Sequence, residues 1–415
     1  MPLLHTSVSL NLGVVVVIPA YDEPYLLLCL MNLKKCALPE CDVEVIVIIN
    51  HSEAENPLVK KNNLEIFEKV KTWSDQNSTH RLKFQVVLMG DLPKKFAGVG
   101  MARKVGMDEA AWRFEKIRQP GGVIACFDAD SRCDKNYLTE LYRHFSQNPK
   151  INACSVYFEH PTEGAEFEAD IYEAITHYEL HLRYYVNAQR WSGFPHAYQT
   201  IGSSMAVRCS AYQEQGGMNK RKAGEDFYFL QKFIELGNFS ELNSTRVLPS
   251  PRKSDRVPFG TGKAVAEILD GKQKPITYNP LIFQDLKIFF ESVFEFYNIE
   301  KEAFAQKFSC LPDTVQSFLK TVDFEKNSFE INKHTNSPAS FHHRFFRWFN
   351  AFMLMKFVHY ARDNFYPNVP VREAASWLAQ NLDGFSSPET TEKELLQWFR
   401  MRDKAGWRQP AVTFQ

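Results

Sequence analysis

Two pairs of carboxylates have the spacing of a reactive site. Asp128 and Asp130 stand one residue apart, directly after a short apolar run that ends at Phe127. Two such oxygen ligands suit Mg²⁺ or Mn²⁺, whose remaining positions go to water and to the phosphates of a nucleotide. The alternative is that both aspartates cap the helix expected near Lys135. Their position at the end of a predicted strand favours the metal site.

The second pair, Glu225 and Asp226, follows Gly224 and precedes an amphipathic helical pattern. At the start of a helix, the dipole and the free backbone amides favour negative charge. The pair could therefore be a simple helix-start signal. Only in combination with the other motifs does it become a candidate for catalysis.

Residues 19–24, with the sequence Pro-Ala-Tyr-Asp-Glu-Pro, follow the first predicted strand. Tyr21 can stack on a base, and Glu23 can accept a hydrogen bond from a ribose or a base. An ordinary strand-to-helix turn with a polar cap is the alternative. This segment alone does not decide between the two.

Two further segments carry positive charge. In residues 98–106, glycines at the start of a helix allow a backbone to approach a ligand closely, and Arg103 lies within this segment. A Pro-, Gly- and Ser-rich loop near residues 249–262 carries Arg252, Lys253 and Arg256. The guanidinium groups of this loop are suited to binding a diphosphate, and we expect the loop to become ordered over a bound diphosphate ligand. A solvated basic loop is the alternative.

Apolar runs alternate with helical patterns through the first half of the chain, which is typical of βαβ units and a mostly parallel sheet with helices on both faces. Ligands of such sheets bind at the carboxyl ends of the strands. The strand and helix ranges that we expect, in alternation, are 14–18, 24–37, 43–49, 57–73, 84–89, 101–114, 123–127 and 135–145.

From about residue 279 to the end the pattern is helical and rich in aromatic residues. We expect an α/β domain over residues 1–270 and a mainly helical domain over residues 271–415. Aromatic stripes at helical spacing are usually core. The alternatives are an acceptor platform and a membrane-facing patch with Arg344, Arg347 and Lys356 beside lipid head groups. The stripes comprise Phe289, Phe290, Phe294, Phe296, Tyr297, Phe345, Phe346, Trp348, Phe349, Phe352 and Phe357.

Composition excludes several classes of protein. The chain has 49 basic and 49 acidic residues, so no global positive charge indicates a nucleic-acid partner. Its eight cysteines include no Cys-x-x-Cys pair, so neither a zinc ribbon nor a disulfide framework is indicated. Without a recognisable signal peptide or an apolar run of membrane-spanning length, we expect a cytoplasmic protein, with peripheral contact to the inner face of the membrane as a variant.

Taken in order, the four motifs over roughly the first 265 residues resemble those of the family-2 glycosyltransferases of the GT-A fold. The resemblance implies an inverting, metal-dependent hexosyl transfer from a nucleotide sugar to an acceptor hydroxyl. It also implies that Asp128 and Asp130 hold Mg²⁺ or Mn²⁺, that Asp226 is the general base, and that Glu225 binds acceptor hydroxyls or replaces Asp226 in that role. Gly202 and Ser203 would border the donor sugar and the acceptor. The residues expected to contact the donor are Pro19, Tyr21, Glu23, Asn50, Arg103, Asp128, Arg252 and Arg256.

One departure concerns the nucleotide. Many members of the family have an acidic pair after the second strand, where this sequence has Asn50, His51 and Ser52. Asn50 can still bond a base edge, and family frequency favours a UDP-sugar, followed by a GDP-sugar. A saccharide or a lipid-linked acceptor is expected. Two other functions stay open: a sugar nucleotidyltransferase, although its Gly-rich phosphate loop is missing, and a nucleotide-sugar-binding module without turnover.

Overall fold

The structure is a computed structural model that describes residues 2–221, 224–254, 260–272, 274–385, 387 and 389–407. The chain packs as two compact units. The first comprises residues 1–168 and 199–263, and the second comprises residues 169–198 and 264–415. The chain therefore leaves the first unit for one long helix, returns to it, and then completes the second unit. The α/β domain expected over residues 1–270 includes that helix.

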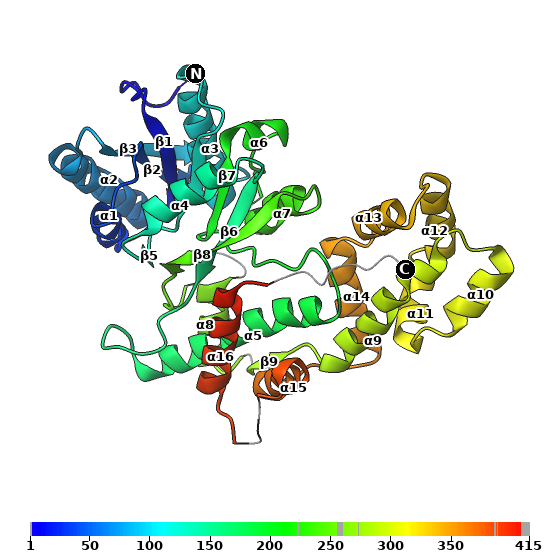
Figure 1. Ribbon diagram of the computed structural model, residues 1–415. Coiled ribbons are helices and arrows are strands. Elements are labelled where there is room, and N and C mark those ends of the chain that lie inside the picture. Colours follow the sequence, from blue (N-terminus) through cyan, green and yellow to red (C-terminus); the bar gives the residue numbers. More distant parts are fainter. Residues whose placement is uncertain are drawn as a thin grey trace. The chain divides into compact units, whose positions relative to one another are not determined.

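The first unit is built on an eight-stranded sheet in the order β3-β2-β1-β4-β7-β6-β8-β5 (Figure 1). Strands β3, β2, β1 and β4 run parallel, as do β6 and β8, whereas β7 and β5 pair with their neighbours in antiparallel fashion. The strands are β1 (Leu12–Ala20), β2 (Asp42–Ser52), β3 (Leu82–Leu92), β4 (Val123–Cys126), β5 (Arg132–Cys133), β6 (Ala153–Phe158), β7 (Met205–Arg208) and β8 (Phe239–Leu248).

Strand β1 marks the point where the order of the parallel strands reverses. The chain proceeds outward from β1 through β2 to β3 and then returns to place β4 on the other side of β1. All nine residues of β1 and all four of β4 are buried, as expected for strands covered on both faces. A ligand of such a sheet binds beside this reversal, at the carboxyl ends of β1 and β4.

Six helices of the first unit lie within the described residues, and α3 packs on strands β1, β2 and β4. Gly106 allows this contact, because a Cβ atom there would come within 2.4 Å of the Val17 side chain. A fully buried ion pair between Arg113 of α3 and Glu44 of β2 adds a polar anchor. The helices are α1 (Leu26–Lys34), α2 (Pro57–Asn77), α3 (Val99–Lys116), α4 (Tyr137–Gln147), α6 (Cys209–Glu214) and α7 (Glu225–Ile234).

The second unit is mainly helical, with a two-stranded sheet of β9 and β10. The expected α/β class, with a mostly parallel sheet and a helical C-terminal region, is therefore confirmed. The elements after the first unit are α5 (Ala169–Trp191), α8 (Thr261–Leu269), β9 (Ile276–Thr277), α9 (Pro280–Glu291), the 3₁₀ helix η1 (Val293–Phe296), α10 (Lys301–Ser309), α11 (Asp313–Thr321), α12 (Phe324–Lys333), α13 (Pro338–Trp348), α14 (Ala351–Asn364), β10 (Val369–Pro370), α15 (Val371–Asp383) and α16 (Glu392–Ala405).

The aromatic stripes of this unit form a packed core, as expected. Phe289 of α9 meets Phe345 of α13 with ring centroids 5.7 Å apart, and Phe290 meets Phe346 at 5.2 Å. These four rings are buried. Their edge-to-face geometry is the one that aromatic quadrupoles favour. Most of the stripe residues therefore pack against one another.

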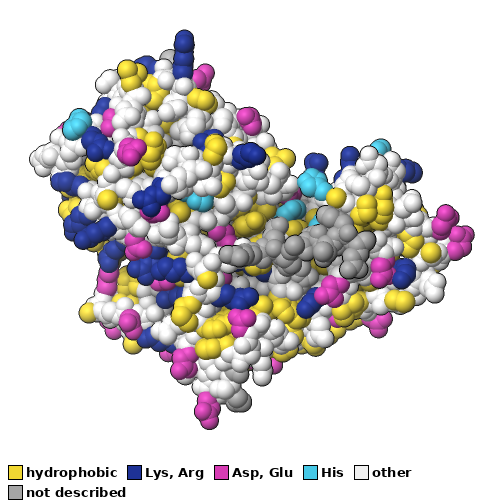
Figure 2. All heavy atoms as spheres, viewed as in Figure 1, with side chains coloured by type: hydrophobic (Ala, Val, Ile, Leu, Met, Phe, Trp, Pro, Cys, Tyr) yellow, Lys and Arg dark blue, Asp and Glu magenta, His cyan; other side chains and the backbone are white. Residues whose placement is uncertain are grey.

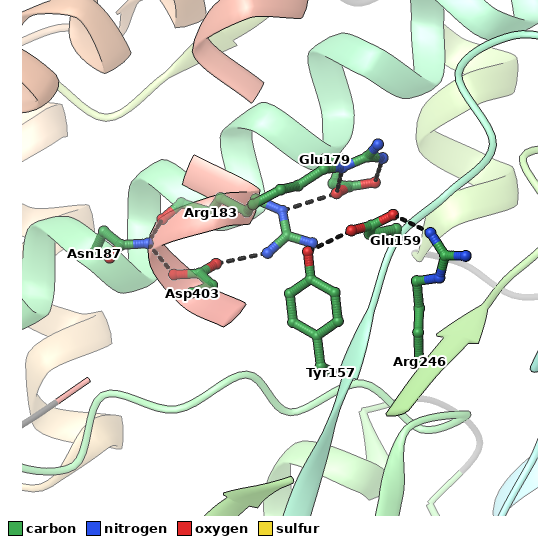
Figure 3. Close-up of polar contacts among 8 residues, drawn as sticks. Tyr157, Glu159, Glu179, Arg183, Asn187, Arg246 and Asp403 are labelled. Atoms are coloured by element: carbon green, nitrogen blue, oxygen red, sulfur yellow. Dashed lines mark hydrogen bonds and ion pairs between the residues drawn. The ribbon is translucent and has the colours of Figure 1, made fainter. Parts of the chain in front are cut away.

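Buried charges join α5 to the C-terminal helix α16 within the second unit. Arg183 donates to Glu179 on its own helix and to Asp403 on α16, at 2.8 and 2.6 Å. Asn187 donates to the other oxygen of Asp403 (Figure 3). Arg400 of α16 in turn binds Glu179 at 2.7 Å. Because each carboxylate is shared between donors, the charges compensate one another in a place that water does not reach.

Acidic and basic side chains both occur across the face shown in Figure 2, among hydrophobic and neutral ones. This mixture agrees with the zero formal net charge of the chain. Among the described residues, every helix is too short or too polar to cross a membrane.

Candidate functional site

The turn after β1 is held by side chains of α2. Asp22 has a positive φ of 46°, a conformation that costs energy in a residue other than glycine. Its backbone N–H donates to Asn63 Oδ1 at 2.8 Å, and its carboxylate accepts from Asn62 at 2.9 Å. Two hydrogen bonds therefore fix the turn. This turn places Tyr21 and Glu23 at the carboxyl edge of the sheet.

Arg252 connects this turn to the end of β4. Its Nε donates to Asp130 at 2.9 Å, and its Nη2 donates to Glu23. Its guanidinium carbon also lies 5.3 Å from the centroid of the Tyr25 ring. Glu23 is 4% exposed, so the arginine neutralises a buried charge. Arg252 of the basic loop therefore links residues 19–24 to the Asp128–Asp130 pair.

Arg103 connects Asp128 to Glu225. This residue of α3 is 4% exposed and donates through Nη2 to Asp128 at 2.5 Å and through Nη1 to Glu225. Gly202 lies directly against it, since a Cβ atom at Gly202 would come within 2.4 Å of Arg103 Nη1. Arg103, which we expect to contact the nucleotide-sugar donor, is thus a neighbour of Gly202, which we expect to border the donor sugar and the acceptor. The guanidinium fills the space beside the glycine.

The pKa of Asp226 suits this carboxylate to proton transfer near neutral pH. Burial raises its pKa, the neighbouring charge of Glu225 raises it further, and Arg103 lowers it in part, so that the pKa is about 6. Such a carboxyl is largely ionised at neutral pH and is a stronger base than an ordinary aspartate. Gly224, in a left-handed conformation with φ of 68°, precedes the pair and starts α7.

Asp130 also has a raised pKa. Burial is the main cause, Arg252 opposes it, and the charges of Glu23 and Asp128 raise the value further, to about 6. The like charge of Asp128 is one of the smaller causes of this rise.

The remaining expected residues are placed as follows. Pro19 lies near the end of β1 and pairs in register with Ile48 of β2. Asn50 is buried, and its amide donates to the Gly98 carbonyl at 3.0 Å, which ties the end of β2 to the glycine segment. Ser203 is fully buried, with its hydroxyl 3.4 Å from that of Ser204.

In the basic loop, Lys253 is exposed. Arg256 lies outside the described residues. On either side of the segment not described, Ser254 N–H donates to the Gly262 carbonyl at 3.0 Å and closes the neck of the loop. The expected ordering of this loop over a donor stays a prediction.

Sequence reasoning missed the residues that support the site from behind. Asn63 is fully buried and is also 3.3 Å from His51 Nδ1, so one asparagine links α2, β2 and the turn at Asp22. The available signal was an Asn-Asn pair at residues 62 and 63 in an otherwise amphipathic helix. A polar residue on the buried face of a helix is commonly hydrogen-bonded for a structural reason.

The donor set of Asp128 and Asp130 fits a hard divalent cation that is completed by substrate. Both carboxylates supply oxygen atoms, and Mg²⁺ characteristically takes one or two carboxylates together with substrate phosphates. Among the described residues, no group of three His, Cys, Asp or Glu side chains could hold a metal alone. A cation here would therefore draw its other ligands from a phosphate group and water.

Comparison with known proteins gives weak likenesses. No protein-family profile and no curated protein matches the chain. Among solved structures, S. aureus TarS 1–349 in complex with UDP-GlcNAc is 13% identical with a TM-score of 0.41, over 78% of this chain and 91% of that one. The same protein in complex with UDP is 14% identical with a TM-score of 0.39, over 82% and 92%. At TM-scores below 0.5 these likenesses carry no conclusion about function.

Proposed function

We propose that the chain is a glycosyltransferase that moves a sugar from a nucleotide diphosphate donor to an acceptor hydroxyl with inversion at the anomeric carbon. One observation carries the proposal: two arginines join all the acidic motifs into a single site. Arg103 binds Asp128 and Glu225, and Arg252 binds Glu23 and Asp130. These residues are far apart in sequence, and they meet beside the strand-order reversal where a nucleotide is bound in open α/β sheets. The order of the motifs, which resembles that of family-2 glycosyltransferases, supports the same conclusion.

In this proposal Asp226 is the general base. Its raised pKa leaves the carboxylate ionised at neutral pH and able to take the proton of the acceptor hydroxyl as that oxygen attacks. Glu225, which pairs with Arg103, has the role of binding acceptor hydroxyls in this proposal. In a single displacement that inverts the anomeric carbon, one base takes the acceptor proton on the face opposite the leaving diphosphate.

The leaving diphosphate requires positive charge. Arg252 can supply guanidinium hydrogen bonds once a donor competes with Glu23 and Asp130 for them. Mg²⁺ or Mn²⁺ held by Asp128 and Asp130 would neutralise the phosphate oxygens when bound. We infer a UDP-sugar as the donor and a GDP-sugar as the next choice, on the family resemblance alone.

A thermal-shift series tests the proposal. UDP, GDP and their sugars are compared with Mn²⁺ and with EDTA, on the wild type and on the Asp128→Ala/Asp130→Ala variant. Preferential binding to the folded state raises the melting temperature. We expect stabilisation by one nucleotide series, only with Mn²⁺ and only in the wild type. Equal stabilisation in EDTA would contradict the metal bridge, and no stabilisation by any nucleotide would contradict the donor site. Binding without turnover over a wide acceptor screen would favour the nucleotide-sugar-binding module.

A further inference from the structure

The second unit contains a cavity of about 220 Å³ that is built only from its own residues. It lies between helix α5, helix α8 and the segment around β9, with α14 and the start of α15 completing its wall. At about 30 Å³ per water molecule, this volume holds roughly seven waters. That is the size of a monosaccharide derivative, and it is smaller than the pockets of about 300–1,000 Å³ that take drug-sized ligands.

Two basic side chains line this cavity. Its described wall includes Lys274 and Arg362 and no Asp or Glu. Arg362 donates through Nε and Nη2 to its neighbour Asp363, at 2.7 and 3.1 Å, so Nη1 keeps its hydrogens for another acceptor. Among the described residues, Lys274 has no carboxylate within ion-pair distance. The Lys274 ammonium, unpaired within the described part of the chain, and the Nη1 donor of Arg362 together favour an anionic ligand.

Aromatic rings form one side of the cavity and are held in place. The His181 ring bonds Thr277 Oγ1 at 2.7 Å, and the Tyr278 hydroxyl bonds His359 at 3.0 Å. The rings of His181 and Tyr278 are 6.1 Å apart, and Tyr185 packs on both. Rigid aromatic surfaces of this kind suit the apolar face of a sugar ring.

Two polar atoms in the wall have no hydrogen-bond partner among the described residues. Asn368 Oδ1 and His177 Nδ1 are buried and make no hydrogen bond in the described structure. Such groups are costly to leave unpaired. A half-turn of the Asn368 amide presents either an acceptor or a donor to the cavity. Sugar hydroxyls, which donate and accept, satisfy groups of this kind.

We propose that this cavity is a second ligand site, separate from the donor site, and that it binds a sugar phosphate of monosaccharide size. The phosphate lies against Lys274 and Arg362, and the ring lies on the aromatic wall beside Asn368. All candidate donor residues belong to the first unit, so this inference does not depend on the proposed transfer reaction.

Isothermal titration calorimetry tests the site with hexose and pentose phosphates, led by glucose 6-phosphate, and with glucose and inorganic phosphate as separate arms. We expect a sugar phosphate to bind, and both glucose and inorganic phosphate to bind at least about tenfold more weakly. Lys274→Ala and Arg362→Gln should each weaken binding by about ten- to a hundredfold, which is the effect of losing a charge-assisted hydrogen bond. Lys272→Ala is the matched control, because Lys272 pairs with Asp270 and lies outside the cavity wall.

Absence of binding by every sugar phosphate would overturn the proposal. It would also be overturned if inorganic phosphate bound as tightly as a sugar phosphate, or if Lys274→Ala and Arg362→Gln bound a sugar phosphate as tightly as the wild type does. The Asp128→Ala/Asp130→Ala variant separates this site from the donor site. It should keep sugar phosphate binding unchanged. If wild-type protein binds no nucleotide but binds a sugar phosphate, the proposed function fails and this inference stands.

Discussion

Arg103 and Glu225 form a buried ion pair that joins helix α3 to the start of α7, and the same guanidinium also holds Asp128. Arg103 and Glu225 are 4% and 2% exposed, so water compensates neither charge. The arginine thereby fixes the positions of two acidic motifs relative to each other. Its removal should affect both stability and ligand binding.

Arg103→Met should lower the free energy of unfolding by about 3–5 kcal/mol, because it leaves the charge of Glu225 buried without a partner. The double variant Arg103→Met/Glu225→Gln should recover part of that loss, since the buried charge is removed as well. Urea denaturation of the wild type and the three variants measures the coupling. Additive effects of the two single changes would show that the pair is not coupled.

Gly202→Ala should displace the Arg103 guanidinium, because the new Cβ would lie 2.4 Å from Nη1. We expect a loss of about 1–3 kcal/mol of stability, as for other overpacked sites, and weaker nucleotide binding. Gly121→Ala is the control, because its Cβ meets other atoms only at 3.5 Å or beyond. Denaturation and nucleotide titration check both variants. A wild-type response from Gly202→Ala would mean that the guanidinium position is not constrained.

Asp226→Asn should stabilise the protein at neutral pH. Because the folded-state pKa is about 6 against an ordinary value of 3.8, ionising Asp226 opposes folding. The wild type therefore loses stability as pH rises from about 4 to 6 and keeps that deficit above 6. One pKa unit corresponds to about 1.4 kcal/mol, so the variant should gain about 1–3 kcal/mol at pH 8 and little at pH 4. Melting curves at the two pH values measure this difference, and equal gains at both would contradict it.

Arg252→Gln should weaken nucleotide binding by about ten- to a hundredfold, since a charge-assisted contact to the diphosphate is lost. Arg143→Gln is a matched control, because Arg143 is exposed and pairs with Glu140 instead of a site carboxylate. Titration with UDP in the presence of Mn²⁺ compares the two. Similar affinities for both variants would place Arg252 outside the donor site.

Local sequence patterns predicted most of the elements that carry the site. Strands β1 and β4 are mostly apolar runs, and polar residues such as Tyr21 and Asp128 lie within two residues of their ends, so the carboxyl edge of the sheet could be anticipated. Contacts between residues that are distant in sequence could not be anticipated. Arg252 bonds Glu23 across more than 200 positions, and no periodicity encodes such a contact.

The hydrogen bonds of Asn63 and the cavity of the second unit could not be predicted from the sequence either. Asn63 has the helical position of a core residue but an amide side chain, and its partners at Asp22 and His51 depend on how α2 packs. Lys274 and Arg362 look like ordinary surface cations in sequence. They share a cavity only because β9 and the end of α14 lie together in the second unit.

The central claim is most directly tested by following the fate of an α-linked UDP-sugar with proton NMR, with water or a screened acceptor receiving the sugar. UDP release and the anomeric configuration of the first product are recorded for the wild type and Asp226→Asn. The account predicts a β-configured product in the wild type, and retained UDP binding with turnover reduced by about 10²- to 10⁴-fold in the variant, the typical contribution of a general base. An α-configured product, or near wild-type turnover in Asp226→Asn, would contradict it.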